Sequence, residues 1–564
     1  MMEVGKMIEA QATAATFGHD MNWHDIDWAK ANRVVRRLQA RIVKAVQEGD
    51  WRRAKKLQRF LTGSFSGRAC AVRRVIENKG KATPGVDGII WKTPELKTRA
   101  VLSLEKRGYK PLPLRRVYIP KANGKQRPLG IPTMKDRAMQ ALHLLALEPI
   151  AETRSDPNSY GFRRGRGTKD AAEQLFTNLG KKVSPQWILD ADITGCFDNI
   201  SHEWLMANIP MDKDILRKWL KAGFVENQRL FSTDRGAPQG GIISPTLANI
   251  TLNGMEKALR DWFGKSSPRR SKSQVNIVRY ADDFVITGRT EQHLKEAEII
   301  IKEFLEERGL TLSPEKTRVA HIDEGFDFLG WNFRKYGGKL LVKPAEKNAR
   351  NHVRKIREIV HRMNTAKQED LIAYLNPIIK GWANYHSSQV SSEIFQEIDH
   401  LIWQGLWKWA RRRHPKKSRT WIKNRYFQQQ GYRDWIFGVR RKTENGDEVC
   451  KLALHANTPI RRHVKVKAEA NPFDPTWEAY FEEREILLTR KALFGRIKTL
   501  WERQEGICPN CQQRVTINQE WVVHHKTPKI LGGGDTLDNL QLLHGNCHRQ
   551  LHANHTLDQL PVLQ

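Results

Sequence analysis

The sequence lacks any apolar run of the roughly 20 residues that a membrane-spanning helix takes, and its N-terminus lacks the apolar core of a signal peptide. Cysteine is scarce, with 6 in 564 residues, and its spacing excludes a disulfide framework. Acidic residues are few beside basic ones, 62 against 96, so the formal charge is +34. We therefore expect a cytoplasmic protein in a reducing compartment, with no membrane partner.

So large an excess of positive charge indicates a polyanionic partner, because each neutralised phosphate releases counterions and makes binding sensitive to salt. Ribosomal and histone-like proteins carry the same excess, so charge predicts nucleic acid without predicting any chemistry. The chain is also too long for one domain, and its length suggests about three to five.

Two stretches of the chain show helical periodicity. Apolar residues recur at helical spacing from Val34 to Val43 and again from Val353 to Met363. Between residues 408 and 442, basic residues alternate with aromatic ones, a mixture typical of surfaces that neutralise phosphates and stack unpaired bases. An ordinary core beneath a basic surface is the alternative. The aromatic residues in question are Trp421, Tyr426, Phe427, Tyr432 and Trp435.

Acidic residues stand among β-prone residues at two places. The segment 275–287 consists of two β-prone runs with Asp282 and Asp283 between them, which predicts a hairpin with both carboxylates near its turn. An earlier β-prone run carries Asp190 and Asp192, and strand alternation puts these two on one face. The two segments together would bring several carboxylates to one place.

Carboxylates clustered at strand ends repel one another unless a cation joins them. Two Mg²⁺ ions about 3.5–4 Å apart can activate an attacking 3′ hydroxyl and stabilise departing pyrophosphate. Each Mg²⁺ typically takes one or two protein carboxylates and fills its other positions with phosphate and water. An isolated pair of aspartates is most often an exposed turn, so the surrounding motifs decide between the two interpretations.

Those motifs follow the order found in reverse transcriptases. Tyr280-Ala281-Asp282-Asp283 resembles the signature of that family, and Asp192 opens a block, Asp-Ile-Thr-Gly-Cys-Phe-Asp, that resembles its first catalytic motif. The resemblance covers about residues 80–340 with no block missing. The companion blocks lie at 119–132, 158–165, 192–202, 235–245, 312–317 and 328–330.

The resemblance implies a role for each matching residue. Asp192, Asp282 and Asp283 would bind two Mg²⁺ ions, whereas Asp190 and Asp198 would have structural roles. Phe197 would stand against the 2′ carbon of the sugar and exclude ribonucleotides; simple core packing is the alternative for this ring. Four further residues would contact the incoming dNTP: Lys121, Arg127, Gln239 and Gly240. For Lys121, a general contact to a phosphate backbone is the alternative.

Paired metal ligands appear near the C-terminus. Cys508-Pro-Asn-Cys511 and His544-Gly-Asn-Cys547 have the short spacing that wraps a tetrahedral Zn²⁺, so we expect a structural zinc. His544 stands where many relatives have a cysteine, which makes it the unusual member of the set.

Histidines between and beyond these pairs resemble the HNH endonuclease motif, a ββα-metal unit. By that resemblance His525 would be the general base that activates water, a role that a neutral imidazole suits near pH 7. Asn539 would support the loop that orients His525. A purely structural zinc ribbon with incidental histidines is the alternative. The residues expected to hold the nuclease metal, a divalent ion taken to be Mg²⁺, are His524, His548 and His552.

The order of the units resembles that of group II intron-encoded proteins over essentially the whole chain. We therefore expect a multidomain α+β protein in which right-hand polymerase fingers and palm, built on an antiparallel sheet with helices, precede an α-helical thumb and a small ββα-metal HNH domain. The expected units are a basic helical extension (1–80), fingers and palm (81–340), a thumb or maturase domain (341–430), a DNA-binding region (431–500) and the HNH domain (501–564).

This resemblance implies an RNA-directed DNA polymerase that binds its group II intron RNA to assist splicing and nicks target DNA to prime reverse transcription during retrohoming. It also implies a bacterial-type protein that joins the nucleoid when bound to DNA, and it sets no oligomeric state. The alternative from another class is an RNA-binding splicing cofactor without significant polymerase activity. The intact Asp192, Asp282 and Asp283 favour the enzyme over this alternative, and the HNH motif opposes a retron-type polymerase.

Overall fold

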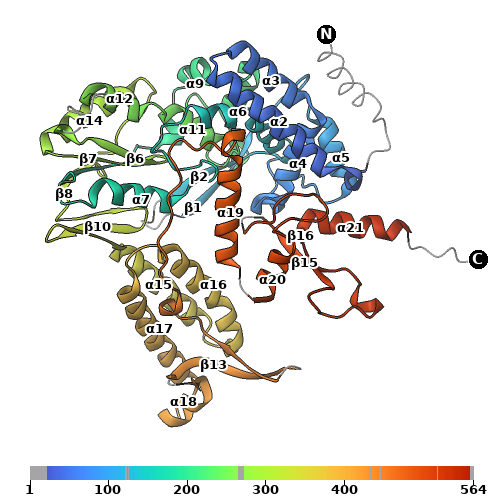
Figure 1. Ribbon diagram of the computed structural model, residues 1–564, viewed down its shortest axis with the longest axis vertical. Coiled ribbons are helices and arrows are strands. Elements are labelled where there is room, and N and C mark those ends of the chain that lie inside the picture. The colour runs from blue at the N-terminus through green and yellow to red at the C-terminus, as the bar shows by residue number, and fades with distance from the viewer. Residues whose placement is uncertain are drawn as a thin grey trace, which may run out of the picture.

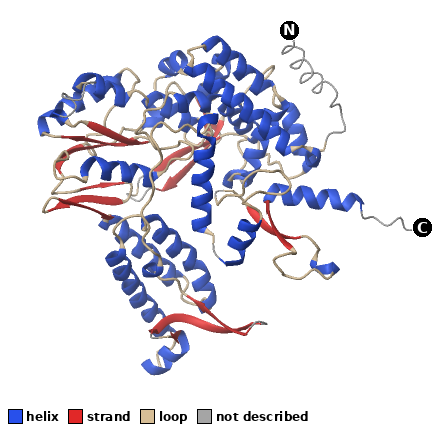
Figure 2. Ribbon diagram, viewed as in Figure 1, coloured by secondary structure: helices blue, strands red, loops and turns tan. Residues whose placement is uncertain are grey.

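The computed structural model describes residues 22–120, 124, 126–264, 272–431, 433–443, 446–493, 495–517 and 519–558. Within these ranges the chain forms several joined units of helices and sheets (Figure 1; Figure 2), and the predicted multidomain α+β class is confirmed. No helix in the described ranges combines the length and the apolar character needed to cross a bilayer.

The N-terminal helices each begin at a polar side chain that caps the first turn. Asp27, Asp50 and Ser64 accept hydrogen bonds from backbone N–H groups at the starts of α2, α3 and α4. The predicted apolar stripe is confirmed on α2, where Val35 and Ile42 are buried. The elements are η1 (Trp23–Asp25), α2 (Trp28–Gln47), α3 (Trp51–Gly63), α4 (Phe65–Glu77), η2 (Lys79–Ala82) and α5 (Pro94–Ser103).

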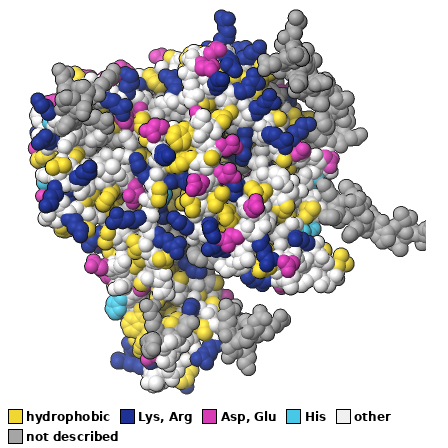
Figure 3. Space-filling model, in the orientation of Figure 1, with side chains coloured by type: hydrophobic (Ala, Val, Ile, Leu, Met, Phe, Trp, Pro, Cys, Tyr) yellow, Lys and Arg dark blue, Asp and Glu magenta, His cyan; other side chains and the backbone are white. Residues whose placement is uncertain are grey.

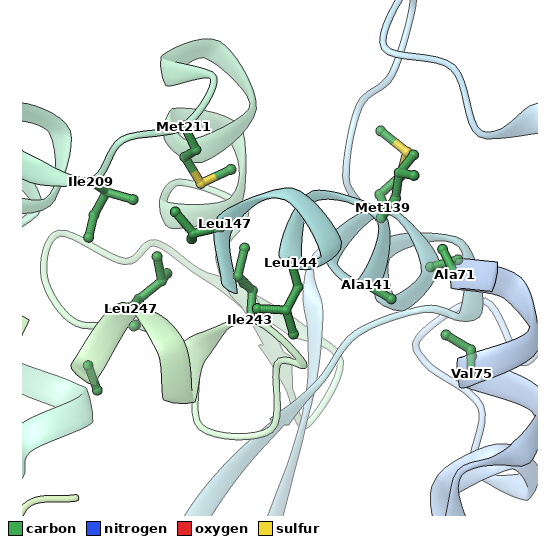
Figure 4. Packing of buried hydrophobic residues seen from close by; sticks show 14 of the residues in the cluster. Ala71, Val75, Met139, Ala141, Leu144, Leu147, Ile209, Met211, Ile243 and Leu247 are labelled. Carbon is green, nitrogen blue, oxygen red and sulfur yellow. The ribbon is translucent and has the colours of Figure 1, made fainter. Parts of the chain in front are cut away.

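One helix, α6 (Met134–Thr153), joins the N-terminal helices to the palm. It is buried along most of its length and packs against α2, α3 and α4 on one side and against α11 (Ser244–Leu252) on the other. Figure 4 shows Met139 and Leu144 of α6 between Val75 of α4 and Leu247 of α11. A helix buried on both sides needs apolar residues all round, and α6 has them.

Two sheets form the fingers and the palm. The fingers sheet has the order β2-β1-β4-β5, and the palm sheet has the order β6-β7-β3-β8 with β3 antiparallel to both of its neighbours. The fingers strands are β1 (Leu114–Pro120), β2 (Gln126–Ile131), β4 (Phe224–Glu226) and β5 (Arg229–Phe231). The palm strands are β3 (Trp187–Ala191), β6 (Asn276–Tyr280), β7 (Asp283–Gly288) and β8 (Arg318–His321).

Helices cover the palm sheet, and a smaller sheet, β11-β10-β9, leads from it to the thumb. The palm helices are α7 (Thr168–Leu179), α8 (Cys196–Asn199), α9 (His202–Asn208), α10 (Lys213–Leu220), α12 (Met255–Phe263) and α14 (Glu291–Glu306). The strands of the smaller sheet are β9 (Phe326–Phe328), β10 (Trp331–Tyr336) and β11 (Lys339–Pro344).

The thumb is a helical bundle with a β-hairpin at its tip (Figure 1). The predicted stripe on α15 is confirmed, since Val353 and Ile356 are buried. The expectation that Tyr426 and Phe427 belong to a base-stacking surface is wrong, because both rings are buried in the thumb core. Tyr432 lies outside the described residues. The elements are α15 (Glu346–Arg362), α16 (Gln368–His386), α17 (Ser392–Arg413), α18 (Arg419–Tyr426), β12 (Phe427–Gln430), β13 (Arg433–Thr443), β14 (Gly446–Lys451) and η3 (His455–Asn457).

Residues 458–474, here called the strap, run from the thumb back across the palm and lead into α19 (Figure 1). The strap is tied to the palm by Asp170 of α7, whose Oδ1 accepts hydrogen bonds from His463 at 2.8 Å, from the backbone N–H of Val466 at 2.8 Å and from Arg484 of α19 at 2.9 Å. The predicted DNA-binding region, 431–500, is therefore divided among the thumb hairpin, the strap and α19.

Residues 501–517 and 519–558, here called the HNH module after the motif that they resemble, form a small unit that follows α19. Its two strands pair antiparallel and lead directly into the last helix, so the unit has the expected ββα order. The C-terminal elements are η4 (Pro475–Trp477), α19 (Glu478–Ala492), α20 (Gly495–Arg503), β15 (Trp521–His525), η5 (Lys529–Leu531), β16 (Leu540–His544) and α21 (Gly545–Asp558).

Substituting Asp170→Asn should destabilise the strap by about 3 kcal/mol, because it leaves the buried guanidinium of Arg484 without its carboxylate. Burial opposes ionisation of Asp170, but His463, Val466 and Arg484 together lower its pKa. The stabilisation is therefore present above the unfolded pKa of about 3.9 and is lost as the pH falls through the lower folded pKa. Hydrogen exchange of the strap at neutral pH measures the effect.

The matched control is Glu173→Gln, one turn further along α7. Glu173 accepts a hydrogen bond from Gln389 at 2.9 Å rather than pairing with a cation, and burial raises its pKa, so the neutral replacement should cost little. An equal loss of protection from hydrogen exchange in both variants would show that the charge of Asp170 does not stabilise the strap.

Candidate active sites

The three aspartates predicted to bind Mg²⁺ come together at the turn of the β6–β7 hairpin. The strand ladder ends at the pair Tyr280–Asp283, so Ala281 and Asp282 form a two-residue turn, in which Ala281 has a φ of +59°. Asp192 follows directly after β3, which lies antiparallel beside β7, and its side chain hydrogen-bonds that of Asp283. The predicted hairpin is confirmed, and two strands supply three carboxylates.

These carboxylates lie close enough to perturb one another's ionisation. Desolvation, with the charges of Asp282 and Asp192, raises the pKa of Asp283 to about 7, and burial also raises the pKa of Asp282. Lys316 forms an ion pair with Asp192, and its hydrogen bond to that carboxylate raises the pKa of the lysine. Oxygen donors that repel one another in this way fit a hard cation such as Mg²⁺.

A buried arginine supports the aspartate turn from behind. Arg279 is 2% exposed, and its guanidinium donates to the carbonyl of Ala281 at 3.1 Å and to the side chains of Asn249 and Asn253 at 3.2 and 3.0 Å. Gly161 lies against the same turn, where an added Cβ would approach the backbone nitrogen of Ala281 to 2.3 Å. The turn is thus held by the buried guanidinium of Arg279.

Several of the residues expected around the nucleotide lie where the fingers sheet meets the palm. Gln239 donates to Asp198 at 3.4 Å, and Gly240, with a φ of +116°, lies so close to β2 that a Cβ would approach the carbonyl of Gly130 to 2.6 Å. Arg127 is exposed on β2, and its charge opposes the rise in the pKa of Asp282. Lys121 lies outside the described residues. Fingers and palm therefore meet beside Gln239 and Gly240.

Replacing Phe197 by alanine should raise the incorporation of ribonucleotides relative to deoxyribonucleotides by about 10- to 100-fold, because a lost steric contact in a pocket is worth about 1–3 kcal/mol. Phe197 is half-buried on α8, and its ring meets that of Phe162 edge-on with the centroids 6.3 Å apart. Single-nucleotide extension with UTP and dTTP measures the ratio. Phe162→Ala is the matched control, and an unchanged ratio in Phe197→Ala would leave core packing as the role of this ring.

The four predicted zinc ligands come together in the HNH module. His544 Nε2 lies 2.9 Å from Gln519 Oε1 and 3.2 Å from the carbonyl of Arg514, so Nε2 carries the proton and Nδ1 faces the sulfurs. Three sulfurs and one imidazole nitrogen fit Zn²⁺. The ligand atoms are buried and lie within 4.8 Å of one another: Cys508, Cys511, His544 and Cys547.

A second histidine cluster lies on the ββα unit. His524 on β15 and His548 and His552 on α21 have ligand atoms within 4.8 Å of one another, and the Nε2 atoms of His548 and His552 are 3.1 Å apart. Burial lowers the pKa of His548, which keeps the imidazole neutral as a ligand must be. Imidazole suits transition metals, whereas Mg²⁺ prefers oxygen, so the donors fit the expected Mg²⁺ poorly.

His525 follows His524 on β15 and has a carboxylate partner. Its Nε2 lies 2.7 Å from Asp535 Oδ1, and hydrogen bonds from His525 and Lys529 lower the pKa of Asp535 to about 2. Asn539 ties the intervening loop together, since it accepts from the N–H of Thr527 at 2.8 Å and donates to the Thr527 carbonyl at 3.1 Å. An imidazole held in this way leaves Nδ1 for another partner.

Three side chains at these sites were not assigned a role from the sequence. Lys316 belongs to the block at 312–317 that resembles reverse transcriptases, and its positive charge was the feature that could have indicated an acidic partner. Asp535 follows three glycines, a pattern that predicts a loop but not a contact with His525. The sequence around Arg279 predicts only that it belongs to a strand. Nothing local indicates that its partners are Asn249 on α11 and Asn253 just after that helix.

Known protein families match this chain in the same order as its structural units. The matches are the N-terminal domain of reverse transcriptase over residues 23–104, reverse transcriptase (RNA-dependent DNA polymerase) over 119–333, the group II intron maturase-specific domain over 349–427 and HNH endonuclease over 508–554.

Individual known proteins are similar to parts of this chain. Protein YkfC of Escherichia coli strain K12 is 34% identical over 330 residues, which span 50% of this chain and 85% of that protein. The group II intron-encoded protein LtrA of Lactococcus lactis subsp. cremoris is 33% identical over 47% of this chain, which spans about half (54%) of LtrA. A telomerase structure from Candida albicans aligns at 14% identity over 56% of this chain and 64% of that one, with a TM-score of 0.34.

The aspartate hairpin and the sheet that holds it define a reverse transcriptase. The chain belongs to the family of group II intron-encoded proteins, and it joins a reverse transcriptase and a maturase-specific domain to an HNH endonuclease domain.

Proposed function

We propose that this protein copies its own group II intron RNA into DNA at a target site that its HNH module nicks, after assisting the RNA to fold and splice. The observation that carries the proposal is the gathering of Asp192, Asp282 and Asp283 at one hairpin, together with a complete histidine cluster in the HNH module. Retrohoming needs both activities in one ribonucleoprotein, and the chain has a candidate site for each.

In the polymerase, Asp192, Asp282 and Asp283 would hold two Mg²⁺ ions. Bound there, such ions supply Lewis-acid activation of the primer 3′ hydroxyl and stabilisation of pyrophosphate. Arg279 keeps the turn that carries Asp282 in place, and Lys316 offsets the charge of Asp192 before the site is loaded. Arg127, exposed on β2 of the fingers, would contact the triphosphate, where a cation offsets the negative charge that develops in the transition state.

In the nuclease, His524, His548 and His552 would hold one divalent ion, and His525 would take the proton from water. Asp535 holds the imidazole of His525 through Nε2, which would leave Nδ1 to take the proton from water. A divalent ion at the cluster supplies charge stabilisation to the scissile phosphate. The all-nitrogen donor set favours a transition metal over Mg²⁺ for this position. Cys508, Cys511, His544 and Cys547 would hold a structural Zn²⁺.

The proposed partners are the intron RNA, the target DNA and dNTPs. The formal charge of +34 suits two nucleic acids at once, and Lys and Arg side chains spread over the face shown in Figure 3, from the N-terminal helices to the thumb. Exposed Trp421 and Trp435 at the thumb tip, the latter 5.0 Å from the Lys423 ammonium, are available to stack unpaired bases. Pairing between intron RNA and DNA would supply most of the sequence recognition.

The experiment that tests the function is primer extension on an RNA template with the purified protein and Mg²⁺, beside the Asp282→Ala variant. DNA synthesis that disappears in the variant establishes the polymerase. A folded, RNA-bound wild-type protein that makes no DNA would instead indicate a splicing cofactor whose acidic triad is inherited but unused.

A further inference from the structure

The thumb contains a cavity between two of its helices. Helices α15 and α17 lie side by side (Figure 1), and residues near the C-terminal end of each line a cavity of about 660 Å³, here called the thumb pocket. This volume is within the range of roughly 300–1,000 Å³ that is usual for ligand sites in proteins. The pocket belongs to neither of the two candidate active sites.

The thumb pocket is built from one face of each helix. On α15, Arg357 and His361 are four positions apart, and on α17, Lys408 and Arg412 have the same spacing. Residues four apart lie on the same side of a helix. Each helix therefore presents a basic face to the pocket.

No acidic residue is among those that line the thumb pocket. Arg357, Lys408 and Arg412 are exposed, and none of the described residues forms an ion pair or a side-chain hydrogen bond with them. Cations that gather without an acidic partner repel one another, so the pocket favours an anion. Its basic side chains are Arg357, His361, Lys408, Arg412, Arg413 and His414.

Basic residues also occur at the ends of helices, where they interact with the last carbonyl groups. This role accounts for Arg413, whose guanidinium donates to the carbonyls of Asn364 at 2.7 Å and of Ala366 at 2.9 Å. The effect of the helix dipole is confined to the last turn. Arg357 and Lys408 each lie more than one turn before the end of their helix, so it does not account for them.

The walls of the thumb pocket are fixed by contacts within the thumb. Trp409 is buried, its Nε1 donates to the carbonyl of Met363 at 3.0 Å, and the guanidinium of Arg413 lies 4.6 Å from the centre of its ring. His414 Nε2 lies 2.8 Å from the hydroxyl of Tyr426. A ligand would therefore meet a pocket that is already formed, which reduces the loss of conformational freedom on binding.

Gly405 leaves open space in the thumb pocket. It lies inside the 22-residue helix α17, where glycine is less favourable than alanine. An added Cβ would meet no atom within 4 Å outside the backbone of this helix, so packing in the thumb does not require glycine here. A residue that weakens the helix without a packing reason indicates that the space itself is used.

We propose that the thumb pocket takes one unpaired nucleotide of the intron RNA and that Arg357, Lys408 and Arg412 hold the phosphates on either side of it. The amides of Gln404 and Asn364 also line the pocket and offer donors and acceptors to the edge of a base. An unpaired nucleotide can leave the stack and enter such a pocket, whereas the bases of a duplex remain stacked and paired.

The position of the thumb pocket favours RNA over target DNA as the source of the nucleotide. All of its lining residues lie within 349–427, the range that matches the group II intron maturase-specific domain. The inference rests on the intron RNA of the proposed function and adds to it one site that holds this RNA.

Binding of a short, fluorescein-labelled single-stranded RNA of mixed sequence to the full-length protein tests the proposal. Fluorescence anisotropy is measured while unlabelled template–primer saturates the polymerase site. Gly405→Leu fills the thumb pocket and should weaken binding by about 10- to 100-fold, the range that the contacts of one bound base provide. Leucine forms helices better than glycine, so the midpoint of thermal unfolding should not fall.

Gly381→Leu is the matched control for Gly405→Leu. Gly381 lies inside α16 of the same bundle, an added Cβ there would also meet no atom within 4 Å, and it does not line the thumb pocket. This variant should bind the RNA as the wild type does.

A charge variant tests the thumb pocket without filling it. Arg357→Gln should reduce the slope of log affinity against log salt by about 0.7, the value for one lost contact to a phosphate of a single strand. Lys355→Gln is its control, because Lys355 is exposed on the same helix but does not line the pocket. This pair still tests the proposal if Gly405→Leu does not fold.

The outcomes separate the thumb pocket from the proposed function. A folded wild-type protein that does not bind the RNA would refute the RNA partner itself. Equal binding by Gly405→Leu and Gly381→Leu, or an unchanged salt dependence in Arg357→Gln, would refute only the thumb pocket. An equal loss in Gly405→Leu of binding to single-stranded DNA of the same sequence would overturn the assignment of the pocket to RNA.

Discussion

Asp192→Asn should lower the rate of RNA-templated DNA synthesis by about 10³-fold or more, equivalent to about 4 kcal/mol of lost transition-state stabilisation. Asp192 is the one member of the triad that lies outside the β6–β7 hairpin, directly after β3, and its carboxylate hydrogen-bonds Asp283 and pairs with Lys316. Asparagine keeps the shape but supplies one neutral oxygen in place of a charged carboxylate. The measurement is single-turnover primer extension at saturating dNTP, so that binding and chemistry are separated.

Asp190→Asn is the matched control for this variant. Asp190 lies two residues earlier, on β3, and burial raises its pKa to about 6, with Arg318 4.0 Å away. Because it is not expected to bind metal, its replacement should change the rate of synthesis little. Equal losses in the two variants would mean that negative charge near β3, and not a metal ligand at position 192, is what the reaction needs.

The sequence was sufficient for the parts of the polymerase site that depend on local pattern. Strand alternation and the central acidic pair predict the β6–β7 hairpin, and the ladder that ends at Tyr280–Asp283 has that form. Helical periodicity likewise predicts the buried faces of α2 and α15. In each case the repeat of a single helix or strand decides which of its residues face inward. The prediction therefore needs no knowledge of contacts between distant segments.

Contacts between distant segments could not be predicted in this way. Trp23 and Asn546 are 523 residues apart, and neither has neighbours that indicate the other. Tyr426 and Phe427 show the converse error: an aromatic residue among cations fits a nucleic-acid surface and a core equally well, and only packing against α17 and β13 places these two inside. The partners of Arg279 and His525 were missed for the same reason, since a hydrogen bond across a fold leaves no local pattern.

His525→Ala should reduce DNA nicking by about 10²- to 10⁴-fold, the range expected when a general base is removed, and should leave primer extension unchanged. Conversion of supercoiled plasmid to the open circle, with Mn²⁺ and Mg²⁺ compared, measures the loss. Asp535→Asn should give a smaller loss, because His525 keeps its imidazole but no longer has a charged partner 2.7 Å from Nε2.

Comparison of this variant with Asp192→Asn makes the assignment specific. If the two sites act independently, His525→Ala reduces nicking and keeps polymerisation, whereas Asp192→Asn reduces polymerisation and keeps nicking. If His525→Ala nicks DNA at the wild-type rate, the imidazole of His525 is not the general base. The base would then have to be sought among His524, His548 and His552. Loss of both activities in His525→Ala would indicate that the HNH module supports the polymerase fold, with which it shares a continuous apolar core.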